Sequence, residues 1–275
     1  MSDTLPSQIF ERIRGLSDFS MGRSFSNEIL PDTTPVPFFG NIDDSSVASV
    51  SLNPSSKEFP KTNRRLVHLS DLKLSEDFFR TDNTLDDQQV QNVYAGLINY
   101  FNTPDWNWEW FQYPELAMNR GLQATYLKSN SSNLLSKACH TDLSPWTTKA
   151  WKNLDKDVQD ALILENMKFL NWFLSRENFK IVVLLGRMGD LFPKSGRSRS
   201  GITPFQYSRD HLESFPERGG PDFEDGFLQL HSGEVKRFFL ISYPPSMPNS
   251  HIMRNMTLFY SAFGDYIAKR ISFSL

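Results

Sequence analysis

Four polar side chains follow runs of largely apolar residues, and together they could do chemistry. They are Asn53, Asp142, Arg187 and Ser246. The amide of Asn53 can orient a water molecule, the ionised carboxylate of Asp142 only accepts hydrogen bonds, and the hydroxyl of Ser246 can hold a phosphate. A run that ends on Asn53-Pro54 is typical of a strand end, because proline has no N–H to continue a ladder. Ligands of parallel sheets bind at the carboxyl ends of the strands, so we expect these side chains to share one site.

The remaining chemistry-bearing residues exclude several kinds of protein. Cys139 is the single cysteine, which excludes an internal disulfide and any four-cysteine zinc or iron–sulfur site. The five histidines are scattered without a His-x-x-x-His pair, so we expect no metal and no cofactor. No Gly-x-Gly-x-x-Gly follows a strand, and neither a Walker element nor a Gly-x-Ser-x-Gly elbow is present. Dinucleotide enzymes, P-loop enzymes and ordinary esterases are therefore excluded.

Composition indicates a globular protein with a sizeable core. The chain has 275 residues, of which 39% are hydrophobic and 22% charged, and this length suits one large α/β domain. No apolar run approaches the ~20 residues of a membrane span, and the first residues lack an apolar signal core. We therefore expect a cytoplasmic protein with no membrane partner. The net charge of −3 gives no global attraction to nucleic acid, so DNA binding would rest on local patches.

Strands and helices are expected to alternate along the chain. Such alternation is typical of a mostly parallel sheet with helices on both faces. We therefore predict a three-layer α/β/α sandwich with a four-stranded central sheet. In chain order the expected elements are a strand over 47–52, a helix over 85–101, a strand ending near Asp142, a helix starting at Thr147 or Thr148, a strand over 180–189, a strand over 237–247 and a C-terminal helix.

Two segments are expected to lie outside this core of a single domain. Residues 1–37 are predicted to form an N-terminal arm, and residues 193–236, rich in Gly, Pro, Ser and charge, an insertion. Lys194, Arg197 and Arg199 are the densest positive cluster of the insertion. This cluster is interpreted as a flexible phosphate clamp, as a lid over a bulky base or as a solvated loop.

The segment 104–115 carries tryptophans at alternating positions. They are Trp106, Trp108 and Trp110. Tight packing of these rings is the simpler interpretation, and stacking on a base or contact with a partner is the alternative.

Motifs at the four expected strand ends occur in a fixed order along the chain. Taken together, they resemble the uracil-DNA glycosylase superfamily, most closely its single-strand-selective and mismatch-specific branches. The similarity spans roughly residues 38–270 without the insertion. The motifs are Ser51-Leu52-Asn53-Pro54-Ser55, Asp142-Leu143-Ser144-Pro145, Leu184-Leu185-Gly186 and Pro244-Pro245-Ser246.

The resemblance implies a catalytic role for Asn53. It takes the place of the family's water-positioning residue, and because its amide is neutral it implies slow turnover or a good leaving base. The alternative is that Asn53 forms an Asx turn that ends the strand.

Asp142 departs from the family pattern. It stands where the family has the Asn that reads the flipped base, and a carboxylate favours a base with an exocyclic amine, such as cytosine. The alternative is a structural cap. Pro244 replaces the family's His, which donates a hydrogen bond to the base, and proline has no donor. His251 is the candidate substitute, or else a surface histidine at a helix start.

The remaining site residues are assigned by position around these motifs. Phe59 matches an aromatic that stacks on the base in the family, although core packing is an equal interpretation. The substrate-binding candidates are Leu52, Pro54, Phe59, His140 and Ser246. The DNA-binding candidates are Ser55, Met247, Pro248, Asn249, Ser250, Arg197 and Arg199.

The resemblance implies a monofunctional DNA glycosylase, since no lysine stands at the four strand ends to form a Schiff base. It would excise a flipped damaged or modified pyrimidine. Asp142, the missing histidine and the insertion favour an altered pocket, as for a modified cytosine in foreign phage DNA. The alternatives are a nucleic-acid or nucleotide-binding protein without catalysis and a small-molecule hydrolase using Asp142 and His140.

Overall fold

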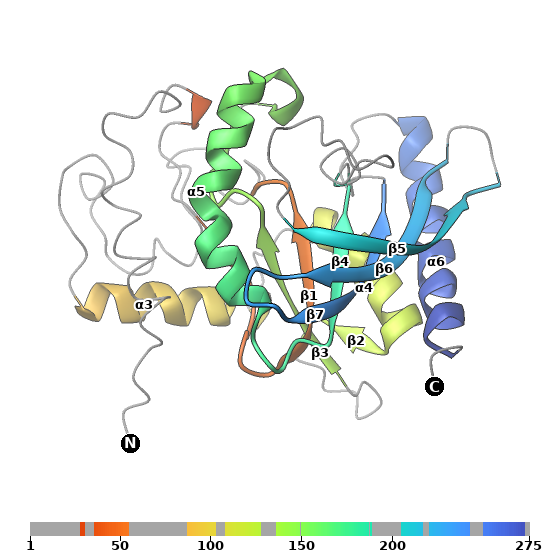
Figure 1. Cartoon of the computed structure of the whole chain (residues 1–275), viewed down its shortest axis with the longest axis horizontal. Helices are drawn as coiled ribbons and strands as arrows, with labels where there is room; N and C mark the ends of the chain where they lie inside the picture. The colour runs from red at the N-terminus through yellow and green to blue at the C-terminus, as the bar shows by residue number, and fades with distance from the viewer. Residues whose placement is uncertain are drawn as a thin grey trace.

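The computed structural model of this chain describes ten segments. They are residues 28–30, 36–54, 87–102, 108–127, 136–148, 150–186, 188, 205–216, 220–242 and 250–272. Their elements form an α/β fold around one mixed, mostly parallel sheet (Figure 1).

The sheet has seven strands in the order β2-β3-β1-β4-β7-β6-β5. The first five in this order are mutually parallel, and the pairs β7-β6 and β6-β5 are antiparallel. The predicted α/β class is confirmed, and so are all four predicted strands. The prediction of a four-stranded sheet is wrong, because three further strands belong to the sheet. The strands are β1 (Ser45–Ser51), β2 (Ala124–Thr125), β3 (Ser136–Asp142), β4 (Ile181–Leu185), β5 (Gln206–Ser214), β6 (Asp222–Gln229) and β7 (Val235–Ile241).

Strand β4 forms because its sequence is β-branched and apolar on both faces. In β4 the run Ile-Val-Val-Leu-Leu is almost wholly buried, as expected for a parallel strand covered on two sides. Val47 of β1 lies opposite Ile181 of β4, and Val50 lies opposite Leu184. The same burial on both sides fixes the register of β1 against its neighbours.

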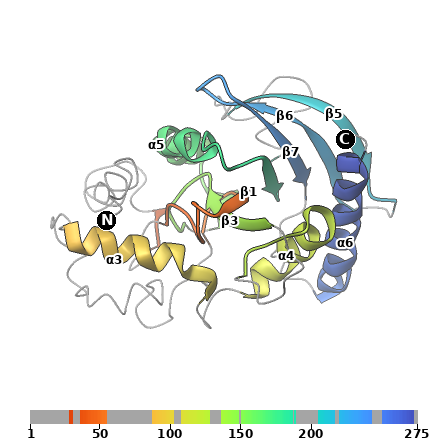
Figure 2. The same cartoon turned by 90° about the horizontal axis from the view of Figure 1, so that it is seen from below.

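Helices cover both faces of the sheet. Figure 2 shows α5 on one face of the central strands, and α4 and α6 together on the other. The predicted helices within 85–101 and at the C-terminus are confirmed. The four α-helices of the described residues are α3 (Asp87–Ile98), α4 (Trp108–Leu122), α5 (Lys156–Leu174) and α6 (Ser250–Ser272).

The start of α5 corrects the prediction of a helix from Thr147 or Thr148. The backbone at Thr147 and Thr148 is extended instead, because Thr147 accepts a hydrogen bond from Leu30 and Thr148 forms a β-bridge with Ile29. A short 3-10 turn over Trp151–Asn153 follows, and α5 begins only at Lys156.

Strands β5 and β6 lie inside the segment 193–236 that the sequence marked as an insertion. They extend the sheet beyond β7 (Figures 1 and 2). Some of the charged residues that suggested a loop are buried in ion pairs. Asp225 is wholly buried and pairs with Arg237, and Glu224 pairs with Arg209. This part of the segment therefore belongs to the sheet.

Only the end of the expected N-terminal arm is described. Of residues 1–37 the structure describes 28–30 and 36–37. Val36 is fully buried, and its N–H donates a hydrogen bond of 2.7 Å to the carbonyl oxygen of Pro145. The next residues lead into the core, where Phe39 forms a β-bridge with His140.

Among the described helices, none has the length and apolar character needed to cross a bilayer.

Candidate functional site

The register of β1 against β3 sets four polar side chains side by side. Ser49 lies opposite His140, and Ser51 lies opposite Asp142. Side chains two residues apart in a strand point to the same face, so all four project toward α4. All four are buried. A polar cluster inside an apolar sheet is costly unless its members bond to one another, which is what these four do.

The cluster opens into a small cleft at the carboxyl ends of β1 and β3. The cleft has a volume of about 10 Å³, which is room for about one water molecule. Within the described residues, Asp142 is the only formally charged side chain of its wall apart from a histidine. The lining residues are Phe39, Ser51, Asn53, Pro54, Trp110, Phe111, His140 and Asp142.

Asp142 is held at the floor of this cleft. The hydroxyl of Ser51 donates a short hydrogen bond to its Oδ1, and Nε2 of His140 lies 3.4 Å from the same oxygen. Its backbone carbonyl accepts a hydrogen bond of 3.0 Å from Nδ2 of Asn166 on α5. Asp142 is therefore fixed from both faces of the sheet.

His140 continues a chain of hydrogen bonds into the protein interior. Its Nδ1 lies 2.7 Å from Oγ of Ser49, which lies 2.6 Å from the hydroxyl of Tyr126. Burial raises the pKa of Tyr126 well above its ordinary value, so this hydroxyl keeps its proton. The chain of Tyr126, Ser49, His140 and Asp142 is called the buried relay below.

Aromatic rings surround the imidazole of His140. Ring centroids of Phe39, Trp110 and Phe111 lie 5.8, 5.0 and 5.2 Å from it. Trp110 stands in the first turn of α4 and is half-buried, unlike the fully buried Phe39 and Phe111. The exposed part of its ring offers an apolar surface beside the cleft.

Asn53 lies two residues beyond β1 and is half-buried. Within the described part of the chain, both hydrogen bonds of its side chain come from Nδ2, at 3.2 Å to the carbonyl oxygen of Pro54 and 3.4 Å to Oγ1 of Thr148. This arrangement leaves Oδ1 to accept a hydrogen bond from water in the cleft.

The structure brings together four of the residues predicted from sequence. Asn53, Pro54, His140 and Asp142 line the same cleft, while Leu52 packs against the hydrophobic core. Ser250 and His251 form the start of α6, and their side chains are outside the described residues. Also outside them are Ser55, Phe59, Arg187, Lys194, Arg197, Arg199, Pro244, Ser246, Met247, Pro248 and Asn249.

Helix α6 nevertheless begins at the same end of the molecule as the cleft. Rings of Tyr113 on α4 and Tyr260 on α6 lie 5.9 Å apart, and further along both helices Gly121 faces Ile267. The two helices therefore run in the same direction. Since Trp110 at the start of α4 lines the cleft, the N-terminus of α6 lies at the same end of the molecule (Figure 1).

Sequence reasoning missed several members of the site. Ser49, Tyr126, Phe39 and Phe111 were not singled out. Ser51 entered only as the first residue of a matched motif, and Trp110 was interpreted as packing with base stacking as the alternative. Serines at alternate positions of an otherwise apolar strand were the signal for Ser49 and Ser51. For Tyr126, which bonds to Ser49 across a long stretch of sequence, the chain offered no signal.

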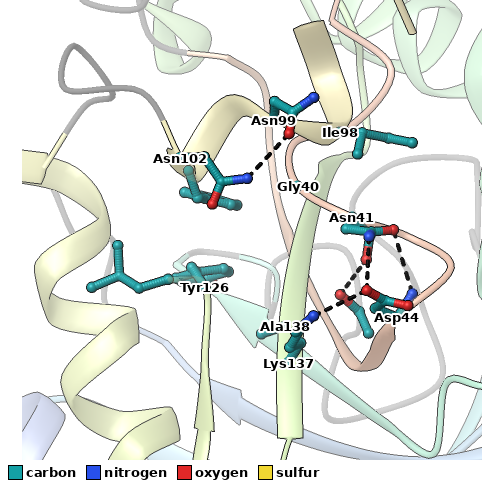
Figure 3. A pocket seen from close by; sticks show the side chains of 12 residues that line it. Gly40, Asn41, Asp44, Ile98, Asn99, Asn102, Tyr126, Lys137 and Ala138 are labelled. Atoms are coloured by element: carbon teal, nitrogen blue, oxygen red, sulfur yellow. Dashed lines mark hydrogen bonds and ion pairs between the residues drawn. The ribbon is translucent and has the colours of Figure 1, made fainter. Parts of the chain in front are cut away.

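A larger cavity lies at the opposite ends of the same strands (Figure 3). It has a volume of about 140 Å³, and Tyr126 lies in its wall. Its polar side chains bond mainly to one another: Lys137 pairs with Asp44 at 3.0 Å, and Asn102 donates to Asn99 at 3.2 Å. Ligands of open α/β sheets bind at the carboxyl ends of the strands, so we assign the chemistry to the smaller cleft.

Among the described residues, no group of three or more His, Cys, Asp or Glu side chains is placed to hold a metal ion. Cys139 is buried, and burial raises the pKa of its thiol, so it is a poor nucleophile. The described polar side chains of the cleft therefore supply an amide, a carboxylate, an imidazole and a hydroxyl.

Comparison with known protein families and with curated proteins finds no match for this chain. The fold and the cleft define an α/β protein with a polar site at the carboxyl ends of two adjacent parallel strands.

Proposed function

We propose that this protein is a monofunctional DNA glycosylase that hydrolyses the N-glycosidic bond of a flipped, modified pyrimidine. The fold would then be a three-layer α/β/α sandwich of the uracil-DNA glycosylase type. One observation carries the proposal: Asn53 and Asp142, distant in sequence, line one cleft at the ends of neighbouring parallel strands. Side chains mounted on rigid strand ends suit a reaction that needs fixed geometry.

In this proposal Asn53 orients the attacking water. Its Nδ2 donates hydrogen bonds to Pro54 and Thr148, which fix the orientation of the amide. Its Oδ1 would then accept a hydrogen bond from an O–H of the water. The volume of about 10 Å³ holds such a water. Because an amide is neutral, it orients water rather than deprotonating it, and the excised base must supply part of the driving force.

Asp142 would read the base. Its Oδ1 is engaged by Ser51 and His140, so an incoming amine, such as N4 of a cytosine, would donate to Oδ2. A pyrimidine ring is too large for the present cleft and would lie across its mouth, against the exposed part of Trp110. An enlarged base such as a hydroxymethylated or glucosylated cytosine of phage DNA extends away from the cleft in this pose. Removal of such bases would serve as a defence against phage.

DNA would be held near the start of α6. A helix N-terminus attracts phosphate through its unpaired N–H groups, and α6 begins at Ser250 on the side of the cleft. These N–H groups would bind a phosphate of the DNA at the same end of the molecule as the base site.

The alternative is a protein that binds a nucleotide or nucleic acid without cleaving it. The small volume of the cleft favours this alternative, because a base does not enter it without movement of its walls. Formation of abasic sites separates the two functions.

The test is alkaline cleavage of labelled DNA after incubation with the purified protein. Single- and double-stranded substrates carry uracil, hypoxanthine, cytosine, hydroxymethylcytosine or glucosylated hydroxymethylcytosine at one position. We expect cleavage at an amine-bearing base and a weaker preference for it in Asp142→Asn. Asp44→Asn, an exposed aspartate of the larger cavity, is the matched control. Absence of abasic sites on every substrate would exclude the glycosylase and leave the binding protein.

A further inference from the structure

The buried relay connects the cleft with the wall of the larger cavity. Tyr126 lies in that wall, and the relay runs from its hydroxyl through Ser49 and His140 to Asp142. Tyr126, Ser49, His140 and Asp142 are each at least nine-tenths buried. These four side chains therefore find most of their hydrogen-bond partners among one another.

The contacts of the relay limit where its protons can lie. Tyr126 keeps its proton, and its hydroxyl lies 2.6 Å from Oγ of Ser49. The Ser49 hydroxyl lies 2.7 Å from Nδ1 of His140 and 3.2 Å from the carbonyl oxygen of Cys139. These distances allow Ser49 to donate to Nδ1, and the surroundings of Nε2 decide between the two tautomers.

A histidine that accepts at Nδ1 carries its proton on Nε2. In this protein Nε2 lies 3.4 Å from both Oδ1 of Asp142 and Oγ of Ser51, and the Ser51 hydroxyl donates its proton to Oδ1. The opposite tautomer would bring the bare lone pair of Nε2 against a carboxylate, which is repulsive. The two ends of the relay therefore favour the same tautomer.

We propose that His140 is a positioning residue for Asp142, held by Tyr126 and Ser49 in the tautomer that carries its proton on Nε2. The Nε2 proton then points at Oγ of Ser51 and Oδ1 of Asp142, and the Ser51 hydroxyl donates to Oδ1. Both contacts lie on the Oδ1 side of the carboxylate, which leaves Oδ2 as the acceptor toward the cleft. This inference rests on the proposed function, since it explains how a buried Asp142 selects a ligand that donates an amine.

The direct test is the protonation state of the His140 ring. Long-range ¹H–¹⁵N spectra of ¹⁵N-histidine-labelled protein at neutral pH distinguish protonated from unprotonated ring nitrogens. The His140 signals are assigned from the four variants that each remove another histidine, namely His68→Gln, His211→Gln, His231→Gln and His251→Gln. We expect a protonated Nε2 and an unprotonated Nδ1. A proton on Nδ1 would overturn the proposal.

A matched pair of variants tests the role of the relay. Ser49→Ala removes the donor to Nδ1, whereas Ser45→Ala makes the same change at a buried serine of β1 outside the relay. We expect the Nδ1 signal to lose its hydrogen-bonded shift in Ser49→Ala alone. Tyr126→Phe, which keeps the ring, should move it in the same direction by a smaller amount. A spectrum of Ser49→Ala equal to that of Ser45→Ala would overturn the proposal.

Excision kinetics provide a second readout. On an amine-bearing substrate, kcat of Ser49→Ala should fall about tenfold, as for loss of one hydrogen bond, with KM within about twofold. Ser45→Ala should keep the wild-type kcat. The spectra do not depend on any activity, so they decide the tautomer even when the wild-type protein forms no abasic sites. In that case the proposed function is wrong, and the spectra alone decide whether the inferred tautomer of His140 is correct.

Discussion

Replacing Gly121 by alanine should push α4 away from α6. A Cβ atom at Gly121 would lie 2.7 Å from Cβ of Ile267 and 2.8 Å from the carbonyl oxygen of Gly264. Carbon atoms in contact are ordinarily about 3.5–4.0 Å apart, so the helices must separate by roughly 1 Å. Both obstacles are attached directly to the backbone of α6, so no side-chain rotation relieves the clash.

The expected cost is worked from two opposing terms. Overpacking of a close helix crossing costs about 1–3 kcal/mol. Gly→Ala in a helix interior gains up to ~1 kcal/mol, but Gly121 is the second-last residue of α4, where the gain is smaller. We expect the free energy of unfolding to fall by roughly 1–2 kcal/mol.

Equilibrium unfolding in urea measures this change. Thr257→Ala, at an exposed position of α6, is the control and should leave the stability within about 0.5 kcal/mol of wild type. Gly264→Ala should push the same two helices apart, since its Cβ would lie 2.8 Å from Cβ of Arg120. The double variant should therefore cost less than the sum of the two single variants. A Gly121→Ala protein as stable as wild type would refute the close crossing.

Three further outcomes follow from other parts of the sheet. Asp225→Asn should lower the free energy of unfolding by about 3–5 kcal/mol, because Arg237 loses a buried partner; a loss below about 1 kcal/mol in urea would contradict this. Gly226→Ala would place a Cβ 1.9 Å from the carbonyl oxygen of Ser208, so limited proteolysis should cut β5 faster than in wild type, and an unchanged digestion pattern would speak against it. Burial raises the pKa of Tyr126, so folding keeps its proton bound at a pH where the unfolded chain releases it. The free energy of unfolding is therefore unaffected by this group below about pH 10 and falls as the pH rises above that value. Above that pH, Tyr126→Phe should flatten the fall in stability by about 1.4 kcal/mol per pH unit, and equal slopes in the two proteins would contradict the assignment.

The sequence was informative where local pattern and burial agree. The run Ile-Val-Val-Leu-Leu of β4 is apolar on both faces, so its strand was predicted within a few residues. Asn53 and Asp142 were expected to meet because carboxyl ends of parallel strands share an edge of the sheet, and both do line the cleft.

Long-range pairing accounts for what the sequence could not indicate. In β6 the buried Asp225 and Glu224 look like loop residues, because the arginines that neutralise them come from other strands. The start of α5 was misplaced because Thr148 pairs with Ile29, far away in the chain. The partners of His140 depend on register and on α4, neither of which local periodicity reveals.

The most direct test of the central claim is single-turnover excision by Asn53→Ala beside the wild-type protein. The substrate is single-stranded DNA with one glucosylated hydroxymethylcytosine, and the product is the abasic site revealed by alkali. Asn99→Ala, an asparagine of the larger cavity, serves as the control. The account predicts that the wild-type protein and Asn99→Ala form the abasic site, and that Asn53→Ala does so about 100-fold more slowly or not at all. Equal rates in wild type and Asn53→Ala would contradict the assignment of the water-positioning residue, and with it the reaction proposed for this cleft.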